Sequence, residues 1–200
     1  MRKFIYLISP NIIDKDFYRK LSEVLSSQKV KFFQLRLKKH KSNEIVNVAK
    51  KIKKITKKYN VKLIINDFYN LTNIIDADGC HIGQNDGQIK KVRKFLKKKI
   101  IGVTCHNSKT IAQNAVVNNA DYLAFGSFNK SKLKPNAKKA SINILRWAKK
   151  NIKKPVVAIG GIDNLNYKIL LKSGAKYIAI SSYIWDNPNL KPKLAIRMFK

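Results

Sequence analysis

The chain has 200 residues, with 43 Lys and Arg against 11 Asp and Glu, which gives a formal net charge of +32 at pH 7. Hydrophobic residues make up 44% of the sequence, and this content excludes a wholly disordered chain of such charge. The longest apolar runs, at 4–8 and 155–159, are far shorter than the roughly 18 residues that a membrane span needs. We therefore expect a soluble protein.

Short β-type runs alternate with longer helical patterns from one end of the sequence to the other. The first run is followed by polar residues without a small-residue cleavage site, so we interpret it as a strand rather than as a secretion signal. The eight predicted strands cover residues 3–9, 31–37, 62–66, 79–83, 101–105, 122–126, 155–160 and 177–181.

The segments between these runs have the spacing of amphipathic helices. Ile45, Val48, Ile52 and Ile55 predict an apolar stripe beneath an outer row of lysines. Ser108 is placed to cap a helix that begins at residue 109. Eight strand–helix units predict an α/β fold, a single (β/α)₈ TIM barrel domain over residues 1–200. A doubly wound open sheet is the alternative, although no GxGxxG motif follows the first strand.

The basic charge has two interpretations, a nucleic-acid partner or a general enrichment in lysine. Of the basic residues 37 are Lys and 6 are Arg, whereas base recognition favours the planar guanidinium group. Aromatic residues do not interleave with the basic runs. We therefore expect no nucleic-acid partner, and a non-enzymatic basic nucleic-acid-binding protein remains the remote alternative. A field of this sign favours phosphorylated small molecules as substrates.

The two cysteines, Cys80 and Cys105, have neither metal-site spacing nor a disulfide framework, which suits a reducing cytoplasm. We expect a cytoplasmic protein. The sequence does not decide whether the chain forms a homo-oligomer.

Polar residues gather where the predicted strands end, and in a parallel barrel these ends converge on one rim. They are Gln34, Arg36, Lys38, Asn66, Asp67, His81, Gln84, Asp86, Thr104, His106, Ser127, Ser131, Lys134, Gly160, Gly161, Ser181 and Ser182. The sequence therefore predicts an active site at this rim.

Charged residues of the rim suggest a site for a diphosphate with a metal ion. Arg36 and Lys38 lie on one side of the second strand and could grip a polyphosphate, although both could also be plain surface charges. Asp67 and Asp86 are two of few acids, and carboxylates in a basic site suit Mg²⁺ bound with phosphate oxygens and water. A helix cap or an ion pair with a lysine is the alternative for each.

The remaining rim residues carry weaker signals. Gly160 and Gly161, together with Ser181 and Ser182, follow strands 7 and 8, where barrels usually seat phosphate, although a plain turn also explains two glycines. We predict His81 to be a packed core residue. For His106 two roles are open, hydrogen bonding at the rim and acid–base catalysis.

Seven segments in order resemble the thiamine-phosphate synthase family, which is related to the thiazole tautomerases. They are QLRLK at 34–38, IND at 65–67, DADGCHIGQND at 76–86, GVTCH at 102–106, ADYLAFGSF at 120–128, VVAIGGI at 156–162 and SS at 181–182. The resemblance implies the same barrel and a Mg²⁺-dependent transferase that joins an aminopyrimidine methyl diphosphate to a thiazole phosphate, giving thiamine phosphate and pyrophosphate.

The resemblance also implies roles for individual residues. Arg36, Lys38 and Lys134 would hold the diphosphate, and Asp67 and Asp86 would bind Mg²⁺. The pyrimidine would contact Gln34, Asn66 and Thr104, and the thiazole phosphate would be held by Ser131, Gly160, Gly161, Ser181 and Ser182.

Two departures from the family pattern leave alternatives open. Leu37 stands where the family usually has Glu, and Leu133 replaces a threonine in the loop that follows the sixth strand. A catalytically altered relative, or a thiazole tautomerase that uses His106, is the alternative. Tautomerases generally lack the two metal-binding carboxylates, so the presence of Asp67, Gln84 and Asp86 favours the synthase.

Overall fold

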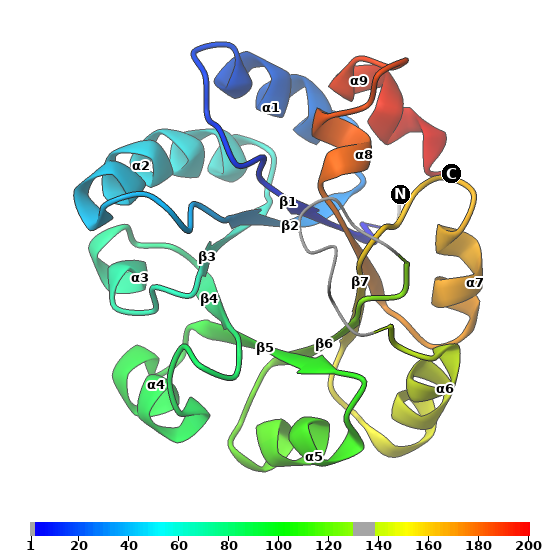
Figure 1. The fold of residues 1–200 in the computed structure, drawn as a ribbon. Helices are drawn as coiled ribbons and strands as arrows, with labels where there is room; N and C mark the ends of the chain where they lie inside the picture. Colours follow the sequence, from blue (N-terminus) through cyan, green and yellow to red (C-terminus); the bar gives the residue numbers. More distant parts are fainter. Residues whose placement is uncertain (1–2, 130–138) are drawn as a thin grey trace.

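Eight parallel strands close into a barrel in the computed structural model, which describes residues 3–129 and 139–200. Each strand pairs with its neighbours in chain order, and β8 pairs with β1 (Figure 1). The strands are β1 (Ile5–Ile8), β2 (Val30–Leu35), β3 (Lys62–Asn66), β4 (Gly79–Ile82), β5 (Ile100–His106), β6 (Tyr122–Gly126), β7 (Val156–Ile159) and β8 (Tyr177–Ile180). The predicted barrel is confirmed, and the open-sheet alternative is wrong.

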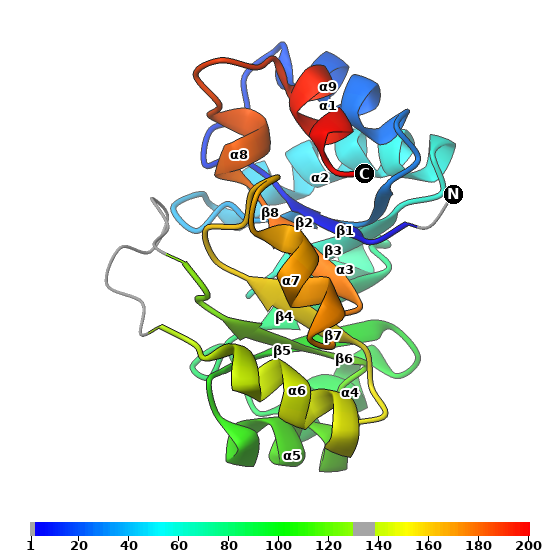
Figure 2. The ribbon, with the colours of Figure 1, turned by 90° about the vertical axis from the view of Figure 1, so that its right-hand side faces the viewer.

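Helices form a ring outside the strands, as the side view in Figure 2 shows for α6 and α7. They are α1 (Phe17–Leu25), α2 (Ser42–Lys58), α3 (Leu71–Ile74), α4 (Ile89–Leu96), α5 (Lys109–Val117), α6 (Ile142–Asn151), α7 (Tyr167–Lys172), α8 (Ser182–Trp185) and α9 (Pro192–Ala195), followed by the 3₁₀ helix η1 (Ile196–Met198). Over the described ranges, no helix is both long enough and apolar enough to cross a membrane.

The core has two layers, because alternate strand residues point inward or outward. Outward side chains pack beneath the helices, and α2 buries Ile45, Ala49 and Ile52 there. Ser108 caps α5 as expected, since its Oγ accepts a hydrogen bond from the Ile111 N–H at 3.2 Å. The inward layer is a separate cluster that includes Tyr6, Phe32, Ile64, Tyr122 and Tyr177.

Two aspartates join neighbouring strands at the N-terminal end of the barrel. Asp78, just before β4, accepts a hydrogen bond from the Leu63 N–H of β3 at 2.9 Å and pairs with Lys53 and Lys62 at 3.0 and 2.9 Å. Burial alone would raise the pKa of Asp78, but the hydrogen bonds from Lys62, the Leu63 N–H and Lys53 outweigh it and lower that pKa.

Asp121, just before β6, repeats this arrangement two strand–helix units further along the barrel. Its carboxylate accepts from the Ile101 N–H of β5 at 2.8 Å and pairs with Arg93. These two contacts fix the strand register at the end of the barrel that lies away from the rim.

Candidate active site

A cavity of about 670 Å³ opens at the C-terminal ends of the strands, and every strand contributes to its wall, either directly or through the loop that follows. Fifteen of the seventeen predicted rim residues line it: Gln34, Arg36, Lys38, Asn66, Asp67, His81, Gln84, Asp86, Thr104, His106, Ser127, Gly160, Gly161, Ser181 and Ser182. The other two, Ser131 and Lys134, lie outside the described residues, as does Leu133.

Cations that directly follow β2 form one side of the cavity. The strand ends at Leu35, two residues earlier than predicted, so that Arg36 and Lys38 extend from the loop that follows. The Arg36 backbone N–H donates to Ser9 Oγ at 3.0 Å, which ties this loop to the end of β1. Burial lowers the pKa of Arg36, and the charge of Asp67 opposes that shift. A guanidinium keeps its proton in either case.

Leu37, the departure from the family pattern in this segment, does not face the cavity. Its side chain is buried in the layer between the strands and the helices. The loss of a glutamate at this position therefore leaves the wall of the cavity unchanged.

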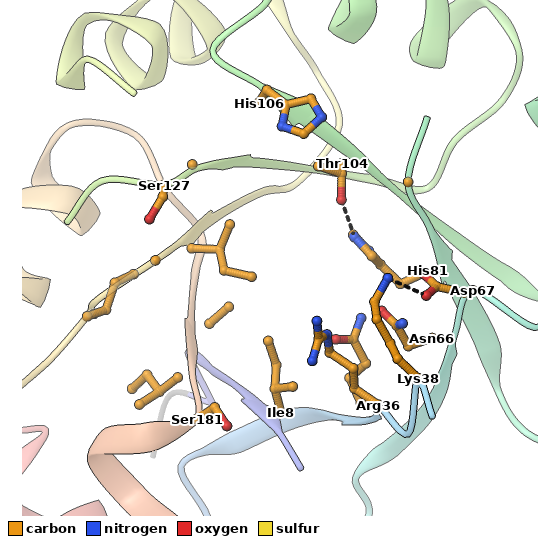
Figure 3. A pocket seen from close by; sticks show the side chains of 18 of the residues that line it. Ile8, Arg36, Lys38, Asn66, Asp67, His81, Thr104, His106, Ser127 and Ser181 are labelled. Carbon is orange, nitrogen blue, oxygen red and sulfur yellow. Dashed lines mark hydrogen bonds and ion pairs between the residues drawn. The ribbon is translucent and has the colours of Figure 1, made fainter. Parts of the chain in front are cut away.

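Two carboxylates lie beside these cations. Lys38 Nζ is 2.8 Å from Asp67 Oδ2, which Figure 3 marks with a dashed line. The Gly83 N–H donates to Asp86 Oδ2 at 2.7 Å and holds that side chain at the cavity. Burial, and next a hydrogen bond with Asp67, raise the pKa of Asp86, and the negative charge of Asp67 adds to the shift. The two carboxylates therefore face each other at short range.

Such a pair fits a divalent cation, since a positive ion relieves the repulsion between the two charges. Carboxylate oxygens are also the ligands that Mg²⁺ prefers, and the ion commonly takes its other ligands from water and substrate phosphates. Across residues 3–129 and 139–200, no group of three or more His, Cys, Asp or Glu side chains forms a complete metal cage. A site of two carboxylates is consistent with that finding.

Neutral polar side chains form the inner wall of the cavity. Gln34 and Asn66 are buried, and Asn66 Nδ2 has no hydrogen-bond partner. A buried amide hydrogen without an acceptor costs about 1–3 kcal/mol, so this atom is suited to a ligand. His81 Nε2 lies 2.8 Å from Thr104 Oγ1 (Figure 3). His81 is buried, as predicted, and it also lines the cavity.

Glycine and serine form the opposite side. Gly160 has φ of 107°, and a Cβ there would lie 2.0 Å from Ser127 Oγ, so only glycine fits. Ser181 Oγ donates to the Ser9 carbonyl at 3.2 Å, and Ser182 begins α8. Figure 3 shows Ser127 across the cavity from Arg36 and Lys38, whereas Ser181 lies beside Ile8. The cavity thus has two polar sides with neutral groups between them.

His106 is the last residue of β5, one residue beyond the predicted end of that strand. The pairing of β5 with β6 shifts register between Thr104 and His106, and His106 has φ of 52°. Its side chain is exposed at the mouth of the cavity. This position suits contact with a ligand at the entrance.

Sequence reasoning missed two residues that reach the site from inside the barrel, Tyr6 and Tyr122. Their hydroxyl oxygens lie 2.7 Å apart, and Tyr122 Oη is 3.0 Å from His81 Nδ1. Tyr6 belongs to the inward layer of the barrel, but nothing local in the sequence indicates which group its hydroxyl contacts.

A (β/α)₈ barrel whose rim joins cations, paired carboxylates and a glycine–serine wall is typical of enzymes that act on phosphorylated small molecules. Residues 5–184 match the family model described as thiamine monophosphate synthase. The chain belongs to the thiamine-phosphate synthase family, as the resemblance implied.

Relatives and solved structures agree with this assignment. A thiamine-phosphate synthase of Pelagibacter ubique is 52% identical over 200 residues, covering 100% of this chain and 97% of the relative. That of Erythrobacter litoralis is 36% identical over 91% of this chain and 88% of the relative. The structure of a thiamine phosphate pyrophosphorylase from Pyrococcus furiosus superposes with a TM-score of 0.88 at 26% identity, covering 98% of this chain and 93% of that one.

Proposed function

We propose that this chain condenses an aminopyrimidine methyl diphosphate with a thiazole phosphate to give thiamine phosphate and pyrophosphate. The observation that carries the proposal is the cavity itself. An ionic side with Arg36, Lys38 and two carboxylates faces a glycine–serine side across neutral polar groups. Two phosphorylated substrates can therefore meet with their anionic ends apart and their rings together.

The ionic side serves the departure of the diphosphate. The bond between the methylene carbon and the diphosphate oxygen breaks, and the oxygen keeps the electron pair. Arg36 and Lys38 bind the oxygens on which negative charge grows, so they stabilise the leaving group more strongly as the bond breaks. Lys134 joins them in this proposal, although it lies outside the described residues. Asp67 and Asp86 would hold Mg²⁺, which supplies further positive charge to the diphosphate when bound.

The neutral groups hold the reacting ring. Gln34, Asn66 and Thr104 bind the aminopyrimidine, and the buried Asn66 Nδ2 donates to an acceptor on it. The electron-rich ring stabilises the methylene cation left by the diphosphate. The thiazole nitrogen then donates its lone pair to that carbon, so that a C–N bond replaces the C–O bond and no protein nucleophile is needed.

The glycine–serine side holds the second substrate. Gly160 and Gly161 bring backbone close to the thiazole phosphate without a Cβ in the way, and Ser181 and Ser182 complete the seat. Ser131 joins this group in the proposal and lies outside the described residues. His106, at the cavity mouth, contacts the incoming substrate.

We assign the reaction to the cytoplasm as part of the same proposal. Cys80 and Cys105 are free and buried, and burial raises the pKa of each thiol to about 12. Buried thiols without a disulfide suit a reducing compartment.

The test is an assay of the purified chain with both substrates and with each one omitted, analysed by mass. Thiamine phosphate should appear only with both substrates and Mg²⁺, and EDTA should abolish it. Product formed equally well in EDTA would refute the metal site. Isomerisation of the thiazole phosphate without condensation would refute the synthase assignment.

A further inference from the structure

A continuous chain of hydrogen bonds crosses the barrel interior beneath the cavity. Gln34 Nε2 donates to Tyr6 Oη at 3.1 Å, and Tyr6 Oη lies 2.7 Å from Tyr122 Oη. Tyr122 Oη lies 3.0 Å from His81 Nδ1, and His81 Nε2 lies 2.8 Å from Thr104 Oγ1. We call these five residues the interior relay. Its two ends, Gln34 and Thr104, are the residues proposed to bind the pyrimidine.

Hydrogen counting gives the relay one direction. Burial is the main cause that raises the pKa of both tyrosines, so each hydroxyl keeps a single hydrogen to donate. Tyr6 Oη accepts from Gln34, and we assign its own hydrogen to the bond with Tyr122, because this orientation leaves neither tyrosine hydrogen unused. Tyr122 Oη then accepts from Tyr6, and its hydrogen points to His81 Nδ1.

The histidine passes this direction on to Thr104. Because Nδ1 accepts, the neutral imidazole carries its hydrogen on Nε2, which donates to Thr104 Oγ1. The Thr104 hydroxyl hydrogen is then free of His81, and Thr104 lines the cavity, so this hydrogen can be donated to a ligand. At the other end, Gln34 uses its nitrogen on Tyr6, so its Oε1 is the atom available to a ligand.

We propose that Tyr6, Tyr122 and His81 are positioning residues that hold Gln34 as an acceptor and Thr104 as a donor, so that the cavity selects a ring with an exocyclic amine and an unprotonated ring nitrogen. The inference rests on the proposed function and makes it more specific. The amine donates to Gln34 Oε1, and the ring nitrogen accepts from the Thr104 hydroxyl. An oxo-pyrimidine would place a carbonyl oxygen against Gln34 Oε1, where two acceptors repel and neither is satisfied.

The first experiment reads the direction of the relay without any substrate. The chain has three histidines, so ¹⁵N NMR of the histidine-labelled protein gives few signals, and a His81→Gln variant identifies those of His81. The proposal expects a neutral ring with hydrogen on Nε2. Hydrogen on Nδ1 would reverse every bond of the relay and overturn the proposal.

The second experiment measures selectivity by calorimetry, as the ratio of affinities for the 4-amino and 4-oxo pyrimidine diphosphates. Tyr122→Phe interrupts the relay at its centre, and Tyr6→Phe releases the Gln34 amide. Each variant should lower this affinity ratio about tenfold, because it loses the preference for the amino ring that one buried hydrogen bond of fixed direction provides. A ratio that stays at the wild-type value in both variants would overturn the proposal.

The control is Tyr59→Phe, which also removes a tyrosine hydroxyl, one that lies 2.8 Å from Ser22 Oγ on the outer side of the barrel. Its affinity ratio should equal that of the wild type, and a similar fall would mean that the effect is not specific to the relay. The ratio is insensitive to a general weakening of binding, and thermal unfolding checks that each variant is folded. Both readouts use binding or spectra, so a failure of turnover would count against the proposed function alone.

Discussion

Asp67→Asn removes one charge from the carboxylate pair and leaves the shape of the side chain unchanged. Asp67 has φ of 64°, a left-handed conformation that Asn adopts as readily as Asp, so the backbone loses nothing. The variant therefore separates the charge of this residue from its structural role.

The expected cost to folding is small. The ion pair with Lys38 is 2.8 Å long, but the lysine side chain is 44% exposed, and such pairs contribute about 0–1 kcal/mol. Relief of the repulsion between Asp67 and Asp86 offsets part of that loss. Turnover should fall at least about 10²-fold, the usual cost of losing a group that binds a metal or stabilises developing charge.

The assay measures product formation across a Mg²⁺ titration, beside thermal unfolding of the same samples. Asp76→Asn is the matched control, since Asp76 also has a positive φ of 54° and an ion pair, at 3.2 Å from Lys99, but does not line the cavity. Undiminished turnover in Asp67→Asn would refute our interpretation of the carboxylate pair. An equal loss in Asp76→Asn would show that the effect is structural.

Three further predictions concern packing, acid stability and thiol reactivity. Gly160→Ala should lower the free energy of unfolding by at least about 2 kcal/mol, because its Cβ would lie 2.0 Å from Ser127 Oγ at a φ of 107°; an unchanged melting temperature would contradict this. Asp78→Asn should cost about 1–2 kcal/mol at pH 7. The pKa of Asp78 in the folded protein is lowered from 3.8, so its contribution to the free energy of unfolding is present above about pH 4 and is lost as the pH falls through the folded pKa. Urea unfolding should therefore give the wild type and Asp78→Asn the same stability at low pH. Cys80 and Cys105, with pKa raised to about 12, should resist iodoacetamide at about pH 8 until urea unfolds the chain, and rapid alkylation of the native protein would contradict their burial.

The sequence was sufficient to predict the barrel because its pattern is regular. Runs of β-branched and aromatic residues recur between amphipathic segments, and each of the eight runs forms a strand. The ends were less predictable. β2 stops at Leu35 because Arg36 and Lys38 turn into the cavity loop, and β5 runs on to His106 through a register shift. Such irregularities depend on the neighbouring strand, which local patterns do not include.

The rim could be predicted for a similar reason, since parallel strands deliver their last residues to one place. What could not be predicted was which groups contact each other. Tyr6 and Tyr122 lie within two of the predicted strands, and their hydroxyls meet across 116 residues of chain. Lys38 was expected to hold the diphosphate, and its Nζ lies 2.8 Å from Asp67 Oδ2. Pairings of this kind follow from the closed barrel and not from spacing along the sequence.

Asp78 and Asp121 secure the strands at the end of the barrel opposite the cavity. Mutations in the loops around the cavity therefore leave the contacts of Asp78 and Asp121 unchanged. A lineage descended from this chain can exchange one chemistry for another by rebuilding its upper loops, while the same carboxylates continue to hold the frame in place. The residues that determine the reaction and the residues that hold the strands together therefore lie at opposite ends of the barrel.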